Sequence, residues 1–418
     1  MKVMLLLGNF VAAAFVVAVC NWLSLIPFRR TYGQHWTERA RKLYTARVAA
    51  ISGIWFVPVD LVLAQRLIWP GETPHWLLAG FVGWLGAMCG TFFFDREVFP
   101  WLAPRDWLRE AITSWTLRLA WLFLFFGVLA AMPLELSWRT WVLGAILVGA
   151  FAFWLHGGLI WCCKKIGLLQ PPSVRLSQIV SEVSVRMNVP VRGVWMLRSS
   201  TANALALAHT GDLLFTRRLL DICPDNEIAA ICAHELGHLC ESKFARAGRL
   251  LGGFIYLPWA FLRPLRHMLG DLAFLILLVV SWAFLMFTRK QSRRLETRAD
   301  TMARAQQEDA GTYARALSRL YEANLMPAVM PKRKTRTHPD LYDRLVAVGA
   351  PPDYPRPEPA NSTSQAGLIY GLALGLLLVP TLNKYIAQHG RNARPEDPEE
   401  ISQEAMLKDT PANDTRER

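Results

Sequence analysis

The sequence predicts a polytopic α-helical membrane protein that also carries a mainly α-helical (α+β) domain with a small β-sheet. Hydrophobic residues make up 53% of the 418 residues and charged residues only 19%. Several uninterrupted apolar runs approach the ~20 residues that a spanning helix needs. Near Gln170 the chain changes to the mixed polar and apolar spacing of soluble helices and strands.

The charge and the cysteines argue against two other classes of protein. The net charge is +13, which Lys/Arg-rich cytoplasmic loops of a membrane protein explain. No basic patch interleaved with aromatic residues is visible, so we expect no nucleic-acid partner. The seven cysteines show no spacing typical of a disulfide framework, which fits a reducing cytosol.

Residues 1–170 are predicted to form a membrane domain with five spans. These lie at about residues 3–26, 48–68, 75–94, 112–132 and 138–163. The basic residues after the first span and Lys164-Lys165 after the fifth are expected on the cytoplasmic side, by the positive-inside rule. The soluble domain that follows is therefore expected on the cytoplasmic side as well.

Three ionisable residues lie within these expected spans: Asp60, Arg118 and His156. A charge in lipid is costly, so each should face a partner or a water-filled space. One hypothesis is a polar chamber between the helices that admits a substrate. The other is a structural ion pair between Asp60 and Arg118, with His156 hydrogen-bonded inside the bundle. Both hypotheses stay open.

The soluble domain begins after Pro171-Pro172. A helix is predicted over residues 173–187, and strands are predicted over 193–197, 203–208 and 213–216. These elements lead to a helix with start signals at Pro224-Asp225, which carries the most informative motif in the chain.

That motif is His234-Glu235-Leu236-Gly237-His238, which reads H-E-x-x-H. On a helix, positions i and i+4 share one face, so both imidazoles can bind one metal ion. Glu235 lies one step round the helix, where its carboxylate can take a proton from a water molecule. Two neutral histidines with a carboxylate base are what a zinc peptidase needs. The motif already supplies ligands, so we expect none from Cys232 or Cys240.

The rest of the chain alternates between apolar and polar segments. A membrane hairpin is predicted over residues 250–288, and its first arm, 250–262, is short enough either to span or to re-enter. The catalytic domain is thus expected in two parts, at 171–249 and 289–350. The remaining segments are a linker at 351–365, a further span at 366–387 and a disordered tail at 388–418.

A third metal ligand is predicted just after the hairpin. Glu296 and Asp300 are four residues apart and share a helix face. Glu296 can complete the ligand set, and Asp300 can accept a hydrogen bond from the far nitrogen of a ligating histidine. The E-x-x-x-D pattern is common on solvated helices, so alone it is weak evidence for a metal ligand. It becomes informative here because it follows H-E-x-x-H in the chain.

H-E-L-G-H, a membrane hairpin and then E-x-x-A-D resembles the gluzincin membrane peptidases of the M48 type, which include CAAX prenyl protease type I and the HtpX heat-shock protease. The resemblance implies a zincin-like catalytic domain with one Zn²⁺ per chain. It also implies that the segment containing Asn203 and Ala204 forms the substrate-binding edge strand. His338 and Arg344, in a T-H-P…R segment, would stabilise the oxyanion.

The function expected from these features is a membrane-embedded zinc metalloendopeptidase, acting in membrane-protein quality control. Its partners would be peptide or membrane-protein substrates and the lipid bilayer, while the sequence does not fix the oligomeric state. Two alternatives stay open: maturation of one lipidated or membrane-associated peptide, and a non-proteolytic membrane scaffold or transporter. Because no eukaryotic targeting signal is visible, we expect the bacterial inner membrane.

Overall fold

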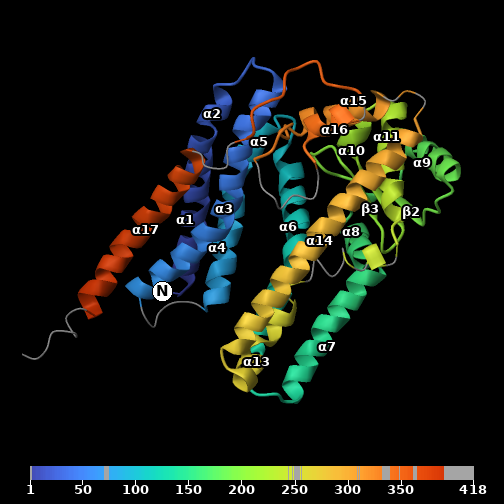
Figure 1. The fold of residues 1–418 in the computed structure, drawn as a ribbon. Helices are drawn as coiled ribbons and strands as arrows, with labels where there is room; N and C mark the ends of the chain where they lie inside the picture. Colours follow the sequence, from blue (N-terminus) through green and yellow to red (C-terminus); the bar gives the residue numbers. More distant parts are fainter. Residues whose placement is uncertain are drawn as a thin grey trace, which may run out of the picture. The chain divides into compact units, whose positions relative to one another are not determined.

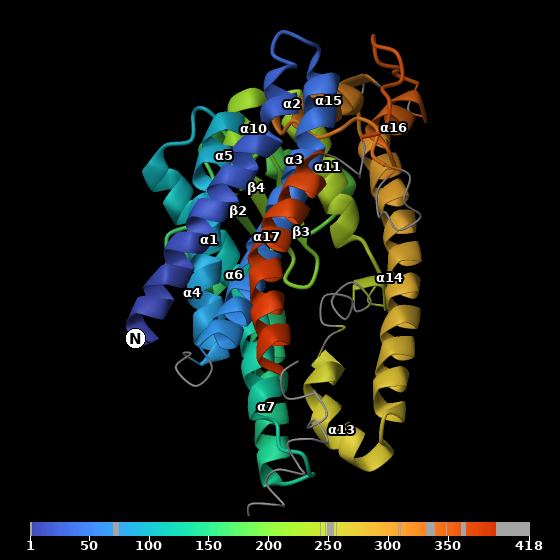
Figure 2. The same cartoon turned by 90° about the vertical axis from the view of Figure 1, so that its left-hand side faces the viewer.

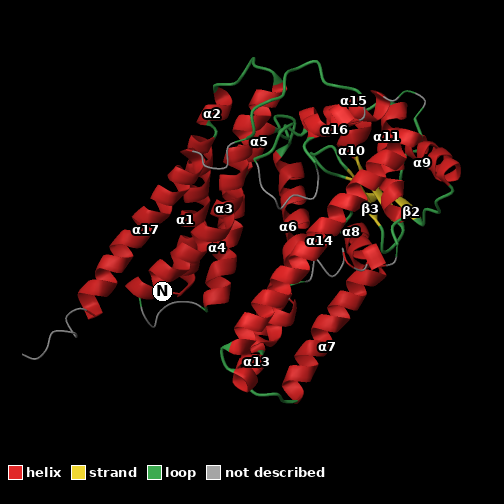
Figure 3. Ribbon diagram, in the orientation of Figure 1, coloured by secondary structure: helices red, strands yellow, loops and turns green. Residues whose placement is uncertain are grey.

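The computed structural model describes residues 2–69, 75–242, 244–246, 248, 255, 257–307, 309, 311–331, 339–347, 349–360 and 365–389. The chain is divided into two compact units (Figure 1). The first comprises Met1–Ser24, Val48–Thr91 and Gln365–Arg418, and the second comprises Leu25–Arg47 and Phe92–Ser364. Helices dominate the described residues, and the strands are confined to one small sheet (Figure 3).

The described part of the first unit has four helical segments: α1 (Lys2–Ser24), the second half of α3 (Trp36–Ile68), α4 (Trp76–Gly90) and α17 (Gln365–His389). Small residues allow α1 and α4 to pack closely. A Cβ atom on Gly86 of α4 would lie 2.1 Å from the carbonyl oxygen of Phe10 in α1. Close backbone approach at small residues is typical of helix pairs in membranes, where apolar side chains gain little by leaving lipid.

Five described helical segments are long and apolar enough to cross a membrane, which confirms the predicted polytopic fold class. They are Lys2–Arg29, Trp36–Arg66, Trp76–Val98, Trp138–Lys165 and Leu272–Ala305.

The expected span at 112–132 lies in α6 (Pro104–Ala131), but the side chains of residues 112–123 are outside the described part. The expected span at 366–387 lies in α17, where the side chains are described without a gap only over Gly367–Leu376, so this span stays a prediction. The expected tail falls mostly on residues 390–418, which are not described.

Two of the expected spans differ from simple apolar helices. After α2 (Ile26–Arg29), α3 begins at Trp36, so more than half of the basic segment between the first two expected spans, residues 27–47, belongs to the same helix as the second span. The fifth span is interrupted between α7 (Trp138–Phe153) and α8 (Leu159–Lys165). A π-helical turn lies there, and Gly157 adopts φ +89°, which glycine tolerates because it lacks a Cβ atom.

The three ionisable residues of the expected spans lie in different surroundings. Asp60 is buried in the first unit. His156 lies in the second unit, exposed at the π-helical turn. The side chain of Arg118 is outside the described part, so both hypotheses about these residues remain predictions.

The second unit contains a four-stranded mixed sheet with strand order β1-β2-β4-β3. Its strands are β1 (Leu169–Gln170), β2 (Gly193–Leu197), β3 (Ala204–Leu207) and β4 (Asp212–Thr216). The parallel pair is β2 with β4, whereas β3 runs antiparallel to β4 and forms an edge of the sheet. The three predicted strands are present. The prediction omitted β1 because two residues show no periodicity.

Helices pack around α11 (Asp225–Leu239), which carries the H-E-x-x-H motif (Figure 2). Ile228, Ile231 and Leu236 of α11 are buried in the core of this unit. Besides α2, α6, α7, α8 and the π-helical turn, the described helical segments of the unit are α5 (Phe92–Val98), α9 (Val174–Met187), α10 (Arg217–Ile222), a 3₁₀ turn (Leu257–Phe261), α13 (Leu262–Leu269), α14 (Leu272–Ala305), α15 (Gly311–Ala323) and α16 (Leu341–Ala347).

The longest helix among the described residues, α14, joins an apolar segment to the segment that carries Glu296 and Asp300. It runs unbroken over 34 residues, from the second arm of the expected hairpin through Glu296 and Asp300 (Figures 1 and 2). No proline or glycine interrupts it, so nothing in the sequence ends the helix at the expected boundary near residue 288. In the first hairpin arm, expected at 250–262, residues 250–254 and 256 are not described.

Candidate metal centre and active site

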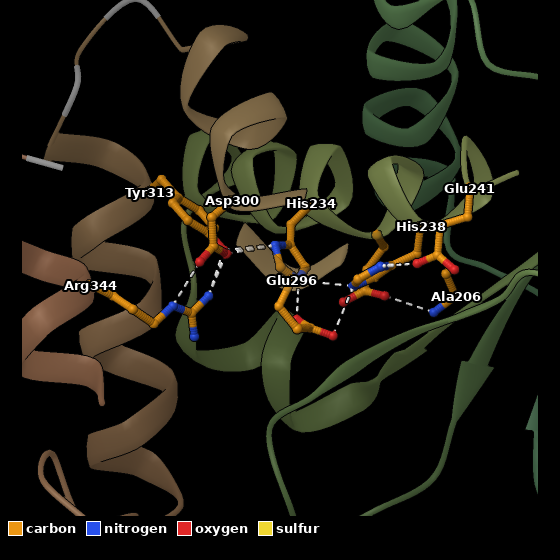
Figure 4. A network of polar contacts seen from close by, with 9 residues as sticks. Ala206, His234, His238, Glu241, Glu296, Asp300, Tyr313 and Arg344 are labelled. Carbon is orange, nitrogen blue, oxygen red and sulfur yellow. Dashed lines mark hydrogen bonds and ion pairs between the residues drawn. The ribbon is translucent and has the colours of Figure 1, made fainter. Parts of the chain in front are cut away.

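Two histidines and a glutamate converge between α11 and α14. His234 and His238 lie one turn apart on α11, with their Nε2 atoms 3.2 Å from each other. Each Nε2 atom is also 3.6 Å from an oxygen of Glu296 (Figure 4). The three candidate ligand atoms lie within 4.8 Å of one another, which is close enough to hold one metal ion.

A small-residue contact brings the two helices together at this place. Gly237 of α11 faces Ala299 of α14, and a Cβ atom on Gly237 would lie 3.1 Å from Cα of Ala299. A larger residue at either position would push the helices apart. Gly237 lies between the two histidines, and Ala299 lies three residues after Glu296. The close approach therefore places the Glu296 carboxylate against both imidazoles.

A buried network holds the far side of His234. Its Nδ1 atom lies 3.0 Å from Oδ1 of Asp300 and 2.8 Å from the hydroxyl of Tyr313. The hydroxyl of Tyr313 donates to Asp300 (2.6 Å), and Nε of Arg344 donates to the other oxygen of Asp300 (2.9 Å). These contacts fix the plane of the His234 ring.

Electrostatics stabilise the ionised form of this network. Burial alone would raise the pKa of Asp300, but the hydrogen bond with His234 and the charge of Arg344 outweigh it and hold the pKa well below its usual range. Burial alone would lower the pKa of Arg344, yet Tyr313 and Asp300 raise it overall. Burial raises the pKa of Tyr313 well above 10. At neutral pH the network thus contains a carboxylate, a guanidinium ion and a neutral phenol.

His238 has a carboxylate behind it as well. Its Nδ1 atom is 2.8 Å from Oε1 of Glu241, whose side chain is only 1% exposed. Sequence reasoning missed both Glu241 and Tyr313. Glu241 lies three residues after the second histidine but beyond the end of α11 at Leu239, so helix spacing does not place it. Tyr313 gave no spacing signal either, since it meets His234 only through the tertiary fold.

The candidate base, Glu235, faces the edge strand. Its Oε2 atom accepts a hydrogen bond from the backbone N–H of Ala206 in β3 (2.7 Å), and the residue is 8% exposed. Asn203 and Ala204 begin this edge, where the sequence placed the substrate. The Asn203 side chain is exposed and Ala204 is buried. The candidate base, the candidate ligands and the edge strand therefore lie close together.

Three other expectations concern His338, Arg344 and the cysteines. His338 lies outside the described residues. The guanidinium group of Arg344 binds Asp300 and Tyr313, among other groups, on the Nδ1 side of His234, whereas Glu296 faces the Nε2 side. Cys232 is fully buried, and burial raises the pKa of its thiol to about 12, which disfavours the thiolate that binds metals.

Comparison with known proteins identifies the domain that holds this site. Residues 172–351 match the family described as Peptidase family M48. Two curated relatives, each named "Protease HtpX homolog", are similar over 68 residues: one from Trichormus variabilis with 37% identity and one from Nostoc sp. with 35%. The matched stretch covers 16% of this chain and 24% of each relative, so the chain spans about a quarter of their length.

The candidate ligands of this site fit zinc. Two imidazole nitrogens and one carboxylate oxygen are a common ligand set of catalytic zinc, which leaves a fourth position open. All three side chains are at most 12% exposed, and the carboxylates behind the two histidines orient the rings. This arrangement suits a catalytic metal centre.

Proposed function

We propose that this chain is a membrane-embedded zinc metalloendopeptidase. His234, His238 and Glu296 would hold one zinc ion per chain, and Glu235 would be the general base. The observation that carries the proposal is that the candidate ligand atoms of His234, His238 and Glu296 lie close together. Glu235, next to His234, contacts the edge strand β3. The M48 domain and the five apolar helices support it.

Different residues of the site would have different roles in peptide-bond hydrolysis. Zinc in such a site lowers the pKa of a bound water towards ~7 and polarises a carbonyl group. Glu235 takes a proton from the attacking water and delivers it to the leaving amine. Asp300, with Tyr313 and Arg344 behind it, keeps the His234 ring in place and Nδ1 as its proton donor.

The substrate would lie extended beside β3 and pair with its backbone at Asn203–Ala204 and beyond. His338 would help stabilise the oxyanion, as the family resemblance implies. The resemblance implies the same for Arg344, but its contacts with Asp300 and Tyr313 favour an action through His234.

We propose membrane-protein quality control as the cellular role, with the M48 domain on the cytoplasmic side of a bacterial inner membrane. The similarity to proteins named Protease HtpX homolog supports this role. Maturation of one lipidated or membrane-associated peptide is the alternative. Many accumulated membrane-protein fragments in a deletion strain would favour quality control, whereas one unprocessed precursor would favour maturation. A non-proteolytic scaffold is less well supported, because a structural zinc needs no base such as Glu235.

The test compares detergent-purified wild type with Glu235→Gln and Glu296→Ala. We expect one zinc per chain in wild type and Glu235→Gln, and casein cleavage in wild type only. Loss of the base should reduce cleavage by about 10²-fold or more. Glu296→Ala should lose the metal. Zinc absent from wild type would overturn the ligand set, and full activity in Glu235→Gln would overturn the role of the base.

A further inference from the structure

The backbone of β3 alternates between the sheet and its open edge. The carbonyl of Asn203 accepts from Thr216 N–H (2.9 Å), and the carbonyl of Leu207 accepts from Gly211 N–H (2.8 Å). Odd-numbered residues therefore bond inward, to β4 and its turn. In an antiparallel pair, the residues between them direct their backbone groups outward. The open edge thus consists of the backbone groups of Ala202, Ala204, Ala206 and Ala208.

Side chains already occupy much of this edge. The amide of Asn324 binds both groups of Ala202: Nδ2 donates to its carbonyl (2.7 Å), and Oδ1 accepts from its N–H (2.9 Å). At the other end, Nη1 of Arg246 donates to the carbonyl of Ala208 (3.1 Å). Glu235 accepts from the N–H of Ala206. No described residue pairs with the outward groups of Ala204.

Asn324 imitates the backbone of a neighbouring strand, because its amide makes the donor and acceptor pair that a strand residue would make. Its position is fixed by the end of α15. Leu325 adopts φ +46°, and the N–H of Met326 bonds to the carbonyl of Tyr321 (2.8 Å), which closes the helix. Nη1 of Arg47 also donates to the carbonyls of Asn324 (2.9 Å) and Leu325 (3.1 Å).

We propose that Asn324 is a specificity-determining residue that stops the substrate strand at Ala204. An extended peptide can pair with Ala204 beside Glu235, but its pairing cannot continue to Ala202, where the edge is filled. Substrate residues beyond this point add no backbone hydrogen bonds. This inference rests on the proposed peptidase function and specifies how much of an extended peptide the edge recognises.

The test measures cleavage as a function of peptide length. A casein peptide with one mapped cleavage site is trimmed one residue at a time from each end. With wild type, kcat/KM should stop rising once the peptide reaches the residue opposite Ala204. In Asn324→Ala it should keep rising over up to two further residues, on one side of the scissile bond. The gain should be about five- to thirtyfold, from one or two new backbone hydrogen bonds.

Two further variants separate this role from a purely structural one. Ser199→Ala removes another side chain that fastens the same loop, by its 2.7 Å hydrogen bond to Glu110, and leaves Ala202 paired. It should keep the wild-type length dependence. Asn324→Asp retains the acceptor for Ala202 N–H and should extend the dependence less than Asn324→Ala.

The outcomes are distinguishable. Wild-type length dependence in zinc-loaded Asn324→Ala, or the same extension in Ser199→Ala, would overturn the inference alone. If Asn324→Ala does not retain zinc, the comparison of Asn324→Asp with wild type decides in the same way. A wild-type protein that binds zinc but cleaves no peptide would overturn the proposed function, and the inference with it.

Discussion

Each candidate histidine ligand has a buried or partly buried carboxylate on the side of the ring away from the candidate metal position. Asp300 contacts Nδ1 of His234 and forms an ion pair with Arg344, and Glu241 contacts Nδ1 of His238. Burying a carboxylate is costly unless it receives hydrogen bonds or faces a positive charge. A histidine that binds zinc through Nε2 carries its proton on Nδ1 and meets this need. The two carboxylates are thus understandable as parts of a metal centre.

We expect Glu241→Gln to weaken zinc binding by about 10- to 100-fold, because the amide still accepts the Nδ1 proton but lacks the charge that strengthens the ligand. Competition with a chromophoric chelator measures this affinity. Glu227→Gln is the matched control, since Glu227 is a buried glutamate at the other end of α11 and binds Arg319 (2.8 Å). It should lower the melting temperature and leave zinc affinity unchanged. Equal weakening in both variants would contradict a specific role for Glu241.

The sequence revealed those site residues whose geometry follows from one helix. His234, Glu235 and His238 share α11, and Glu296 and Asp300 share α14, so spacing alone placed each group. Tyr313 joins the site from α15 and could not be predicted in this way. Arg344 was singled out only through the family resemblance, and its ion pair with Asp300 arises from the packing of α16 near α14.

At the scale of elements, the site depends on the distance between α11 and α14. Gly237 and Ala299 set this distance, and the Glu296 carboxylate lies one turn from Ala299. A side chain added at position 237 would therefore weaken zinc binding by moving α14, without contacting the metal itself.

We expect Gly237→Val to lower both the zinc affinity and the melting temperature, and Gly237→Ala to have a smaller effect of about 1–3 kcal/mol, which is typical of overpacking. The double variant Gly237→Ala with Ala299→Gly removes one of the two crowding atoms and should recover part of the loss. Zinc titration and thermal unfolding of the three proteins measure this coupling. Strictly additive losses would show that the two residues do not act through the same contact.

The elements that the sequence predicted well have a clear periodicity. The strand predicted at 193–197 is β2, and the helix predicted at 173–187 is α9 within one residue. The short elements β1 and α10 were not predicted, since two and six residues carry no reliable pattern. The interruption near Gly157 also escaped prediction, because the apolar pattern continues across it.

At the scale of the whole molecule, the candidate site joins two stretches of chain that are distant in sequence. His234 and His238 precede the expected hairpin, and Glu296 follows it. Bound zinc would stabilise only the unit that contains these ligands, because a ligand stabilises the folded state to which it binds.

We therefore expect zinc removal to act on one unit only. After chelation, amide hydrogen exchange should become faster in α11, in the second half of α14 and in α15, whereas α1 and α4 should keep their protection. Mass spectrometry of the exchanged peptides measures this, and reloading with zinc should reverse it. A uniform rise in exchange over both units would contradict the assignment of zinc to this site.

The continuity of α14 has a mechanical consequence. From Leu272 to Glu296 the helix rises about 36 Å, at 1.5 Å per residue. A tilt of about 5° around the Leu272 end would carry Glu296 sideways by about 3 Å, whereas zinc coordination tolerates only ~0.2 Å. The helix is thus a lever arm with a metal ligand near its tip. Since bilayer thickness influences the tilt of spanning helices, α11 must move together with α14 for the coordination geometry to survive in membranes of different thickness.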